Sequence, residues 1–170
     1  SKSQFDNHII EKENLVYMSL GTVVPKSLYD LVGNDRLKSY ITDVYMTVIS
    51  YFSEHKKYKL IVSCPLDIKS PSENVTIVQY CNQEKILSRA KLFITHGGGN
   101  SLNEAILFDC PMLVIPFFGD QIVSSKLIVN KKIGKSLCNS FDSDFDHSTY
   151  SILNNLDELL LGKGISCKNC

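Results

Sequence analysis

The sequence of 170 residues has no excess of charge of either sign. Its 18 Lys and Arg residues balance 18 Asp and Glu residues, which leaves a formal net charge of zero at pH 7. Proteins that bind nucleic acid usually carry clustered Lys and Arg side chains, because contacts with phosphate supply much of their affinity. No such cluster stands out in the sequence, so we expect no nucleic-acid partner.

Long apolar runs are missing as well. No segment approaches the roughly 20 apolar residues that a membrane-spanning helix requires, and the polar start SKSQFDNHIIEKEN has no signal-peptide core. We therefore expect no membrane contact from this segment. We interpret residues 1–13 as a linker or lead-in and residues 14–170 as one domain, because a composition of 44% hydrophobic residues supports a compact core.

The sequence also lacks a cysteine arrangement typical of a metal site. Cys167 and Cys170 form one isolated CxxC pair, whereas structural zinc normally needs four ligands. Four other cysteines occur in or beside apolar runs, where cysteine behaves as a small buried hydrophobe. These are Cys64, Cys81, Cys110 and Cys138. We expect reduced thiols and a reducing compartment.

Short apolar runs alternate with longer helical patterns along the chain. The expected strands are Leu15–Leu20, Leu60–Ser63, Val75–Val78, Leu92–Thr95, Met112–Ile115 and Lys135–Leu137. The expected helices are Leu37–Ser53, Glu84–Ser88, Ser101–Phe108, Ile122–Lys131 and Thr149–Leu160. Several of the strands are apolar on both faces, so the pattern predicts an α/β fold with a doubly wound parallel sheet. Ligands of such folds bind at the carboxyl ends of the strands.

One of these strand-to-helix corners is rich in small residues. The strand is followed by a histidine, three glycines, an asparagine and a serine: His96, Gly97, Gly98, Gly99, Asn100 and Ser101. Small residues let backbone N–H groups crowd around an anion, and the dipole of the following helix adds partial positive charge there. We therefore predict a phosphate site at this corner.

Acidic and amide side chains follow in the same stretch. Glu104 lies one turn into the expected helix, where a carboxylate can accept hydrogen bonds from a ribose diol. Asp120 and Gln121 come after the next strand and suit sugar hydroxyls. Phosphate, ribose and sugar sites in one run predict a pocket for a nucleotide sugar.

The stretch closely resembles the donor-binding signature of UDP-dependent glycosyltransferases of the GT-B architecture, in the branch of the macrolide and glucuronosyl transferases. That signature reads F-x-T-H-G-G-x-N-S-x-x-E-A, then P-M-x-x-x-P, then D-Q. The matching positions are Phe93, Thr95, His96, Gly97, Gly98, Asn100, Ser101, Glu104, Ala105, Pro111, Met112, Pro116, Asp120 and Gln121. The resemblance extends from about Asn14 to Leu161 and implies a Rossmann-like C-terminal half of a GT-B glycosyltransferase.

Two segments upstream resemble further parts of the family pattern. Gly21 and Thr22 match an S-x-G-[ST] corner, in which the glycine permits a tight turn and the threonine hydroxyl meets a phosphate. The alternative is a plain turn after a strand. Tyr80, Cys81 and Gln83 occupy the position of a W-x-P-Q-like segment, which implies a ring stacked on uracil and contacts with base and ribose. The alternative for the tyrosine is a half-buried core position.

The resemblance also implies roles for the main corner. His96 would hydrogen-bond the diphosphate and stabilise the charge that grows on the leaving group. Asn100 and Ser101 would supply further donors or, alternatively, cap the helix. Glu104 would bind the ribose or, alternatively, lie exposed on the helix, and the Asp-Gln pair would bind hydroxyls of the transferred sugar or merely start a helix.

A general base for the acceptor is not identifiable in the sequence. In the family that the chain resembles, this base belongs to a preceding acceptor-binding domain, whereas His8, His55 and His147 lie in no matching context and are expected at the surface. The resemblance therefore implies that the chain alone is incomplete for turnover. Its partners would be a UDP-sugar and an acceptor-binding N-terminal domain or separate subunit.

An acidic run near the end of the chain imitates a metal signature. Asp142, Asp144 and Asp146 form overlapping DxD triplets, but they lie in a polar stretch and not at the end of an apolar strand. We expect a solvated loop there, no catalytic metal, and no cofactor other than the UDP-sugar donor.

The sequence thus predicts the UDP-sugar-binding domain of an inverting, metal-independent glycosyltransferase that moves a hexose to an acceptor hydroxyl. Two alternatives stay open: a free-standing catalytic subunit of a split GT-B N-acetylglucosaminyltransferase, and a non-catalytic nucleotide-sugar-binding module. We expect a cytoplasmic location, with the lumenal side of a membrane-tethered enzyme in the endoplasmic reticulum as the alternative. The identities of the sugar and of the acceptor stay open.

Overall fold

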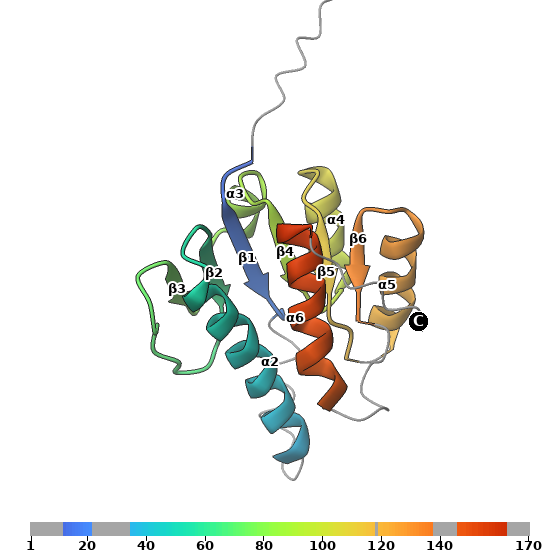
Figure 1. Cartoon of the computed structure of the whole chain (residues 1–170). Coiled ribbons are helices and arrows are strands. Elements are labelled where there is room, and N and C mark those ends of the chain that lie inside the picture. The colour runs from blue at the N-terminus through green and yellow to red at the C-terminus, as the bar shows by residue number, and fades with distance from the viewer. Residues whose placement is uncertain (1–11, 22–34, 118, 138–145, 163–170) are drawn as a thin grey trace, which may run out of the picture.

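The computed structural model describes residues 12–21, 35–117, 119–137 and 146–162 (Figure 1). Its strands are β1 (Leu15–Ser19), β2 (Lys59–Ser63), β3 (Val75–Val78), β4 (Leu92–Thr95), β5 (Met112–Val114) and β6 (Gly134–Ser136). Its helices are α2 (Asp35–Glu54), α3 (Gln83–Leu87), α4 (Gly99–Leu107), α5 (Asp120–Asn130) and α6 (Asp146–Leu161). Each predicted strand and helix is present, with ends that differ by up to three residues.

The six strands form one parallel sheet in the order β3-β2-β1-β4-β5-β6. From β1 the chain proceeds outward to β2 and β3, and it then returns to place β4 on the other side of β1. The order therefore reverses between β1 and β4, and such a switch point opens a crevice at the carboxyl ends of the two strands. The predicted doubly wound parallel sheet is confirmed.

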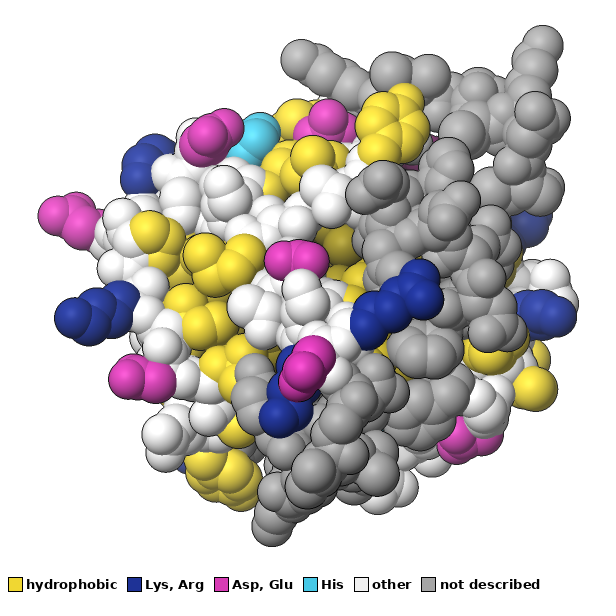
Figure 2. Space-filling view, turned by 90° about the horizontal axis from the view of Figure 1, so that it is seen from below, with side chains coloured by type: hydrophobic (Ala, Val, Ile, Leu, Met, Phe, Trp, Pro, Cys, Tyr) yellow, Lys and Arg dark blue, Asp and Glu magenta, His cyan; other side chains and the backbone are white. Residues whose placement is uncertain are grey.

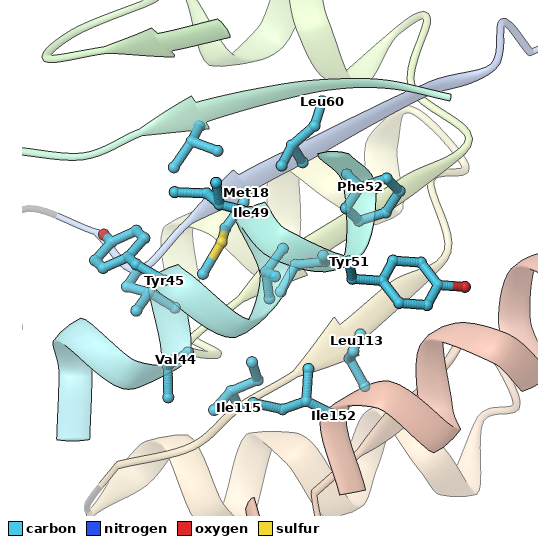
Figure 3. Close-up of a cluster of buried hydrophobic side chains, with 14 of the residues drawn as sticks. Met18, Val44, Tyr45, Ile49, Tyr51, Phe52, Leu60, Leu113, Ile115 and Ile152 are labelled. Atoms are coloured by element: carbon cyan, nitrogen blue, oxygen red, sulfur yellow. The ribbon is translucent and has the colours of Figure 1, made fainter. Parts of the chain in front are cut away.

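Helices cover both faces of the sheet. Helices α2 and α6 pack together on one face, and α3, α4 and α5 lie on the other (Figure 1). Figure 3 shows Ile49 of α2 next to Met18 of the sheet, and Ile152 of α6 beside Leu113. Strands β1, β4 and β5 are buried along their whole length, which explains their continuous apolar sequences.

A lysine near the start of the described residues joins two helix ends. The Nζ of Lys12 donates hydrogen bonds to the carbonyl oxygens of Leu87, Ser88 and Phe108 at 3.3, 3.1 and 2.8 Å. These carbonyls end α3 and α4, where a cation offsets the negative end of each helix dipole. Residue 12 of the predicted lead-in thus holds the carboxyl ends of α3 and α4 together, and their amino ends face the opposite edge of the sheet.

Candidate functional site

The predicted site residues gather at the carboxyl edge of the sheet, around the switch point between β1 and β4. Gly21 follows β1, and His96 follows β4 directly. Helices α3 and α4 begin at the same edge, so Gln83 and Gly99 lie at their amino ends. Figure 2 views the molecule from this edge and shows hydrophobic, acidic and basic side chains interspersed over the described surface.

The imidazole of His96 is enclosed by glycines. A Cβ atom added at Gly21 would lie 2.7 Å from Cε1 of the ring, and one at Gly98 would lie 2.5 Å from Nε2. A Cβ at Gly97, whose φ is +90°, would lie 2.8 Å from Cγ1 of Val114. The glycines therefore make room for one imidazole and one valine. This steric reason was not part of the sequence interpretation, which considered only turns and anion binding.

Burial controls the protonation of this ring. His96 is 8% exposed, and burial lowers its pKa below the usual 6.5, although the carboxylate of Asp120 and the backbone of Ser19 act in the opposite direction. The imidazole is therefore largely neutral at pH 7. Its Nδ1 is the one buried side-chain nitrogen or oxygen that has no hydrogen-bond partner within the described part of the chain. Such an atom is costly unless something meets it.

The amino end of α4 has no side-chain cap. Gly98 is the N-cap residue with an extended backbone, and the alternative that Asn100 or Ser101 caps the helix is wrong. The helix starts at Gly99, two residues earlier than predicted. Gly99 and Asn100 are exposed, and a Cβ at Gly99 would meet no atom within 4 Å. The first N–H groups of the helix thus border open space, as an anion site requires.

A chain of hydrogen bonds connects β1 with α3 and α4. The hydroxyl of Tyr17 donates to Oε1 of Gln83 at 3.2 Å and lies 3.3 Å from Sγ of Cys81. The amide nitrogen of Gln83 donates to Oε2 of Glu104 at 2.6 Å and to Oγ of Ser101 at 3.3 Å. Glu104 is partly buried, so the alternative of an exposed helix glutamate is wrong. The sequence analysis did not identify Tyr17, because a tyrosine in an apolar strand is expected to be a core residue and its hydroxyl gives no separate signal.

Tyr80, which directly precedes Cys81 of these hydrogen bonds, lies at the surface. Its side chain is 86% exposed, so the alternative of a half-buried core position is wrong. Asn82, which stands where the family pattern has proline, caps α3 by accepting a hydrogen bond from the backbone nitrogen of Lys85 at 3.0 Å. The departure from the family pattern therefore has a structural reason.

The predicted Asp-Gln pair separates into two environments. Gly119, with φ of +58°, precedes α5, and Asp120 is exposed in its first turn. Gln121 is 5% exposed, and its Oε1 accepts a hydrogen bond from the backbone nitrogen of Phe117 at 3.0 Å. The glutamine therefore fixes the loop before α5, while the aspartate is accessible. Thr22 lies outside the described residues.

Comparison with known proteins agrees with this geometry. The sequence model of the family described as UDP-glucoronosyl and UDP-glucosyl transferase matches residues 8–160. The chain belongs to this family. Membership confirms the resemblance on which the site assignment is based, although the assignment of each residue stays a prediction.

Individual members of the family match only in part of their length. UDP-glucosyltransferase YojK of Bacillus subtilis is 31% identical over 128 residues, which are 74% of this chain and 29% of that protein. UDP-glucuronosyltransferase 3A1 of Bos taurus is 44% identical over 75 residues, which are 43% of this chain and 14% of that protein. The chain thus spans less than a third of the length of these relatives.

The fold of the family is also seen in solved structures. The Medicago truncatula UGT71G1 structure, complexed with UDP-glucose, matches 91% of this chain and 33% of its own with a TM-score of 0.64 at 19% identity. The Rossmann-like fold of a GT-B glycosyltransferase is therefore confirmed. Within the described ranges, no helix is both long and apolar enough to cross a bilayer.

Metal binding by this family member stays untested. Within the described part of the chain, no group of three or more His, Cys, Asp or Glu side chains is placed to hold an ion. Asp142, Asp144 and the side chain of Asp146 lie outside the described part of this acidic run. The absence of a catalytic metal is therefore still a prediction.

The fit between the imidazole and its glycines predicts a contrast between two neighbouring positions. We expect Gly98→Ala to lower the free energy of unfolding by about 1–3 kcal/mol, because the added methyl overlaps the ring of His96. We expect Gly99→Ala to change it by less than about 0.5 kcal/mol, since open space surrounds that position. Chemical denaturation measures both. A penalty for Gly98→Ala that persists in a His96→Ala background would show that the ring is not what the methyl meets.

The lowered pKa of His96 predicts a pH dependence of stability. Between the folded-state value and the ordinary 6.5, the unfolded chain binds more protons than the folded one, so stability falls as the pH falls through this window. We expect the wild type to lose more stability than His96→Gln between pH 7.5 and pH 5.5 in denaturation experiments. The variant retains the other histidines and thus isolates this ring. Parallel curves for the two proteins would contradict the prediction.

Proposed function

We propose that this chain is the UDP-sugar-binding domain of an inverting glycosyltransferase that moves a hexose to an acceptor hydroxyl without a metal ion. The observation that carries the proposal is the buried imidazole of His96, whose Nδ1 has no partner among the described residues and whose Nε2 lies beside Gly98 at the uncapped amino end of α4. Together they provide an imidazole, a helix dipole and free N–H groups at one point. A diphosphate satisfies all three.

The protonation of His96 suits a leaving diphosphate. Burial keeps the free imidazole neutral by lowering its pKa, so the empty site does not hold an isolated charge. An arriving anion raises the pKa of a neighbouring histidine. As the bond between sugar and diphosphate breaks, negative charge grows on the diphosphate, and fixed hydrogen-bond donors stabilise that charge more in the transition state than before it.

The remaining site residues match the other parts of the donor. The exposed ring of Tyr80 provides a stacking surface for the base. Glu104, held by Gln83, provides a carboxylate for the ribose diol. Asp120, exposed in the first turn of α5, provides an acceptor for hydroxyls of the sugar. The donor thus runs along the carboxyl edge of the sheet from α3 to α5.

The acceptor and its general base would come from outside the described residues. The chain covers less than a third of the length of the relatives reported above. We propose that an acceptor-binding domain or a separate subunit faces the carboxyl edge of the sheet. Alone, this chain binds the donor and turns it over poorly.

Calorimetric titration with UDP-glucose tests this proposal. We expect the wild type to bind in the presence of EDTA with the affinity that it has in Mg²⁺. We expect His96→Gln to weaken binding by about 10-fold or more, the loss typical of a hydrogen bond to a charged group. UDP-glucose suits the test because its diphosphate is esterified at both ends and therefore does not titrate near neutral pH.

A second histidine provides the matched control. His55 directly follows α2. Its ring stacks on Tyr51 at a centroid distance of 3.9 Å, and its Nδ1 lies 2.7 Å from the carbonyl oxygen of Tyr51. We expect His55→Gln to bind UDP-glucose as the wild type does. A wild type that does not bind UDP-glucose, or a His96→Gln variant that binds it equally well, would refute the proposal.

A further inference from the structure

The hydrogen-bond chain from Tyr17 to Glu104 points to a determinant of nucleotide specificity. We propose that Tyr17 is a positioning residue which, through Gln83, orients the Glu104 carboxylate so that the site prefers ribonucleotides to 2′-deoxyribonucleotides. The inference rests on the proposed function, because it needs a nucleoside diphosphate at this edge of the sheet. It adds a residue that never touches the ligand.

The chemistry of the groups fixes the direction of the chain. An ionised carboxylate only accepts hydrogen bonds, so Gln83 must turn its amide nitrogen toward Glu104, as observed at 2.6 Å. The amide oxygen of Gln83 then faces Tyr17 and needs a donor, which the phenolic hydroxyl supplies at 3.2 Å. Because the hydroxyl has one proton, the thiol of Cys81, at 3.3 Å, must donate to the tyrosine oxygen. The donor and the acceptor of each hydrogen bond in this chain are therefore determined.

The side chain of Tyr17 is held rigidly, so it can determine the orientation of Gln83 and, through it, of Glu104. Its side chain is 2% exposed, and its ring stacks on Phe93 at a centroid distance of 5.1 Å and an interplanar angle of 9°. The residue lies in the middle of β1, which pairs with β2 on one side and β4 on the other. The hydroxyl of Tyr17 therefore has a fixed position. The side chain of Gln83 must adopt the rotamer that reaches this hydroxyl.

Glu104 depends on this support for its orientation. The residue lies on α4, and its side chain is only partly buried, so without a partner it would sample several rotamers. Gln83 occupies one carboxylate oxygen and also bonds Ser101 one turn earlier on the same helix. In the inferred arrangement, the other oxygen accepts hydrogen bonds from the ligand. A diol offers two adjacent hydroxyls to this carboxylate, whereas a 2′-deoxyribose offers one, and a fixed carboxylate discriminates between them more sharply than a mobile one.

Binding of UDP and of 2′-deoxy-UDP to the 170-residue chain tests the inference. We expect the wild type to prefer UDP, and Tyr17→Phe to reduce that preference by about three- to ten-fold, the range of one net hydrogen bond. The reduction should come from weaker binding of UDP, with little change for 2′-deoxy-UDP. Tyr58→Phe is the matched control, because Tyr58 is 1% exposed and its hydroxyl donates to the carbonyl of Leu160, on the opposite face of the sheet. We expect it to keep the wild-type preference.

The possible results separate the inference from the proposed function. Wild-type protein that binds no UDP overturns both. Wild-type protein that binds UDP, with an unchanged preference in Tyr17→Phe or an equal loss for both nucleotides, overturns the inference alone, since a merely structural role weakens both ligands alike. If Tyr17→Phe does not fold, Gln83→Met interrupts the same chain from a partly exposed position. A preserved preference for UDP in that variant is equally decisive against the inference.

Discussion

The close fit of one imidazole between two glycines determines how the carboxyl edge of this sheet is built. His96 follows β4, and its ring occupies the space that side chains at Gly21 and Gly98 would fill. Gly98 is at the same time the N-cap of α4. The ring, the backbone at Gly21 and the start of the helix therefore depend on one another. A larger residue at either glycine would displace the imidazole and with it the uncapped helix end.

The sheet topology supplies the rigid frame for this arrangement. Strands β1 and β4 are neighbours although β2 and β3 separate them in the sequence, and both are buried along their length. Groups from distant segments thus meet at one edge: Tyr17 from β1, Gln83 from α3 and Glu104 from α4. At the other edge, Lys12 holds the carboxyl ends of α3 and α4. Buried strands and paired helices let a small domain keep polar side chains in fixed orientations.

The sequence predicted the fold, and it predicted which residues gather at the carboxyl edge of the sheet, because both depend on local patterns. Apolar runs gave the strands, and the glycines after β4 indicated the helix start that borders the predicted phosphate site. The sequence did not show that Gln121 turns inward to the backbone of Phe117, that Asn82 caps α3, or that Tyr17 reaches Gln83. These contacts join residues that meet only through three-dimensional packing. The sequence of a motif does not show whether a polar side chain faces a ligand or the interior of the protein.

The central claim is that the imidazole of His96 meets the diphosphate of a nucleotide at the amino end of α4. Nitrogen NMR of the His96 side chain during titration with UDP tests it directly, because ring-nitrogen shifts report both protonation and hydrogen bonding. The account predicts a neutral ring in the free protein at pH 7 and a change at the ring nitrogens that saturates together with binding. Ring-nitrogen signals that stay unchanged while UDP binds would contradict it.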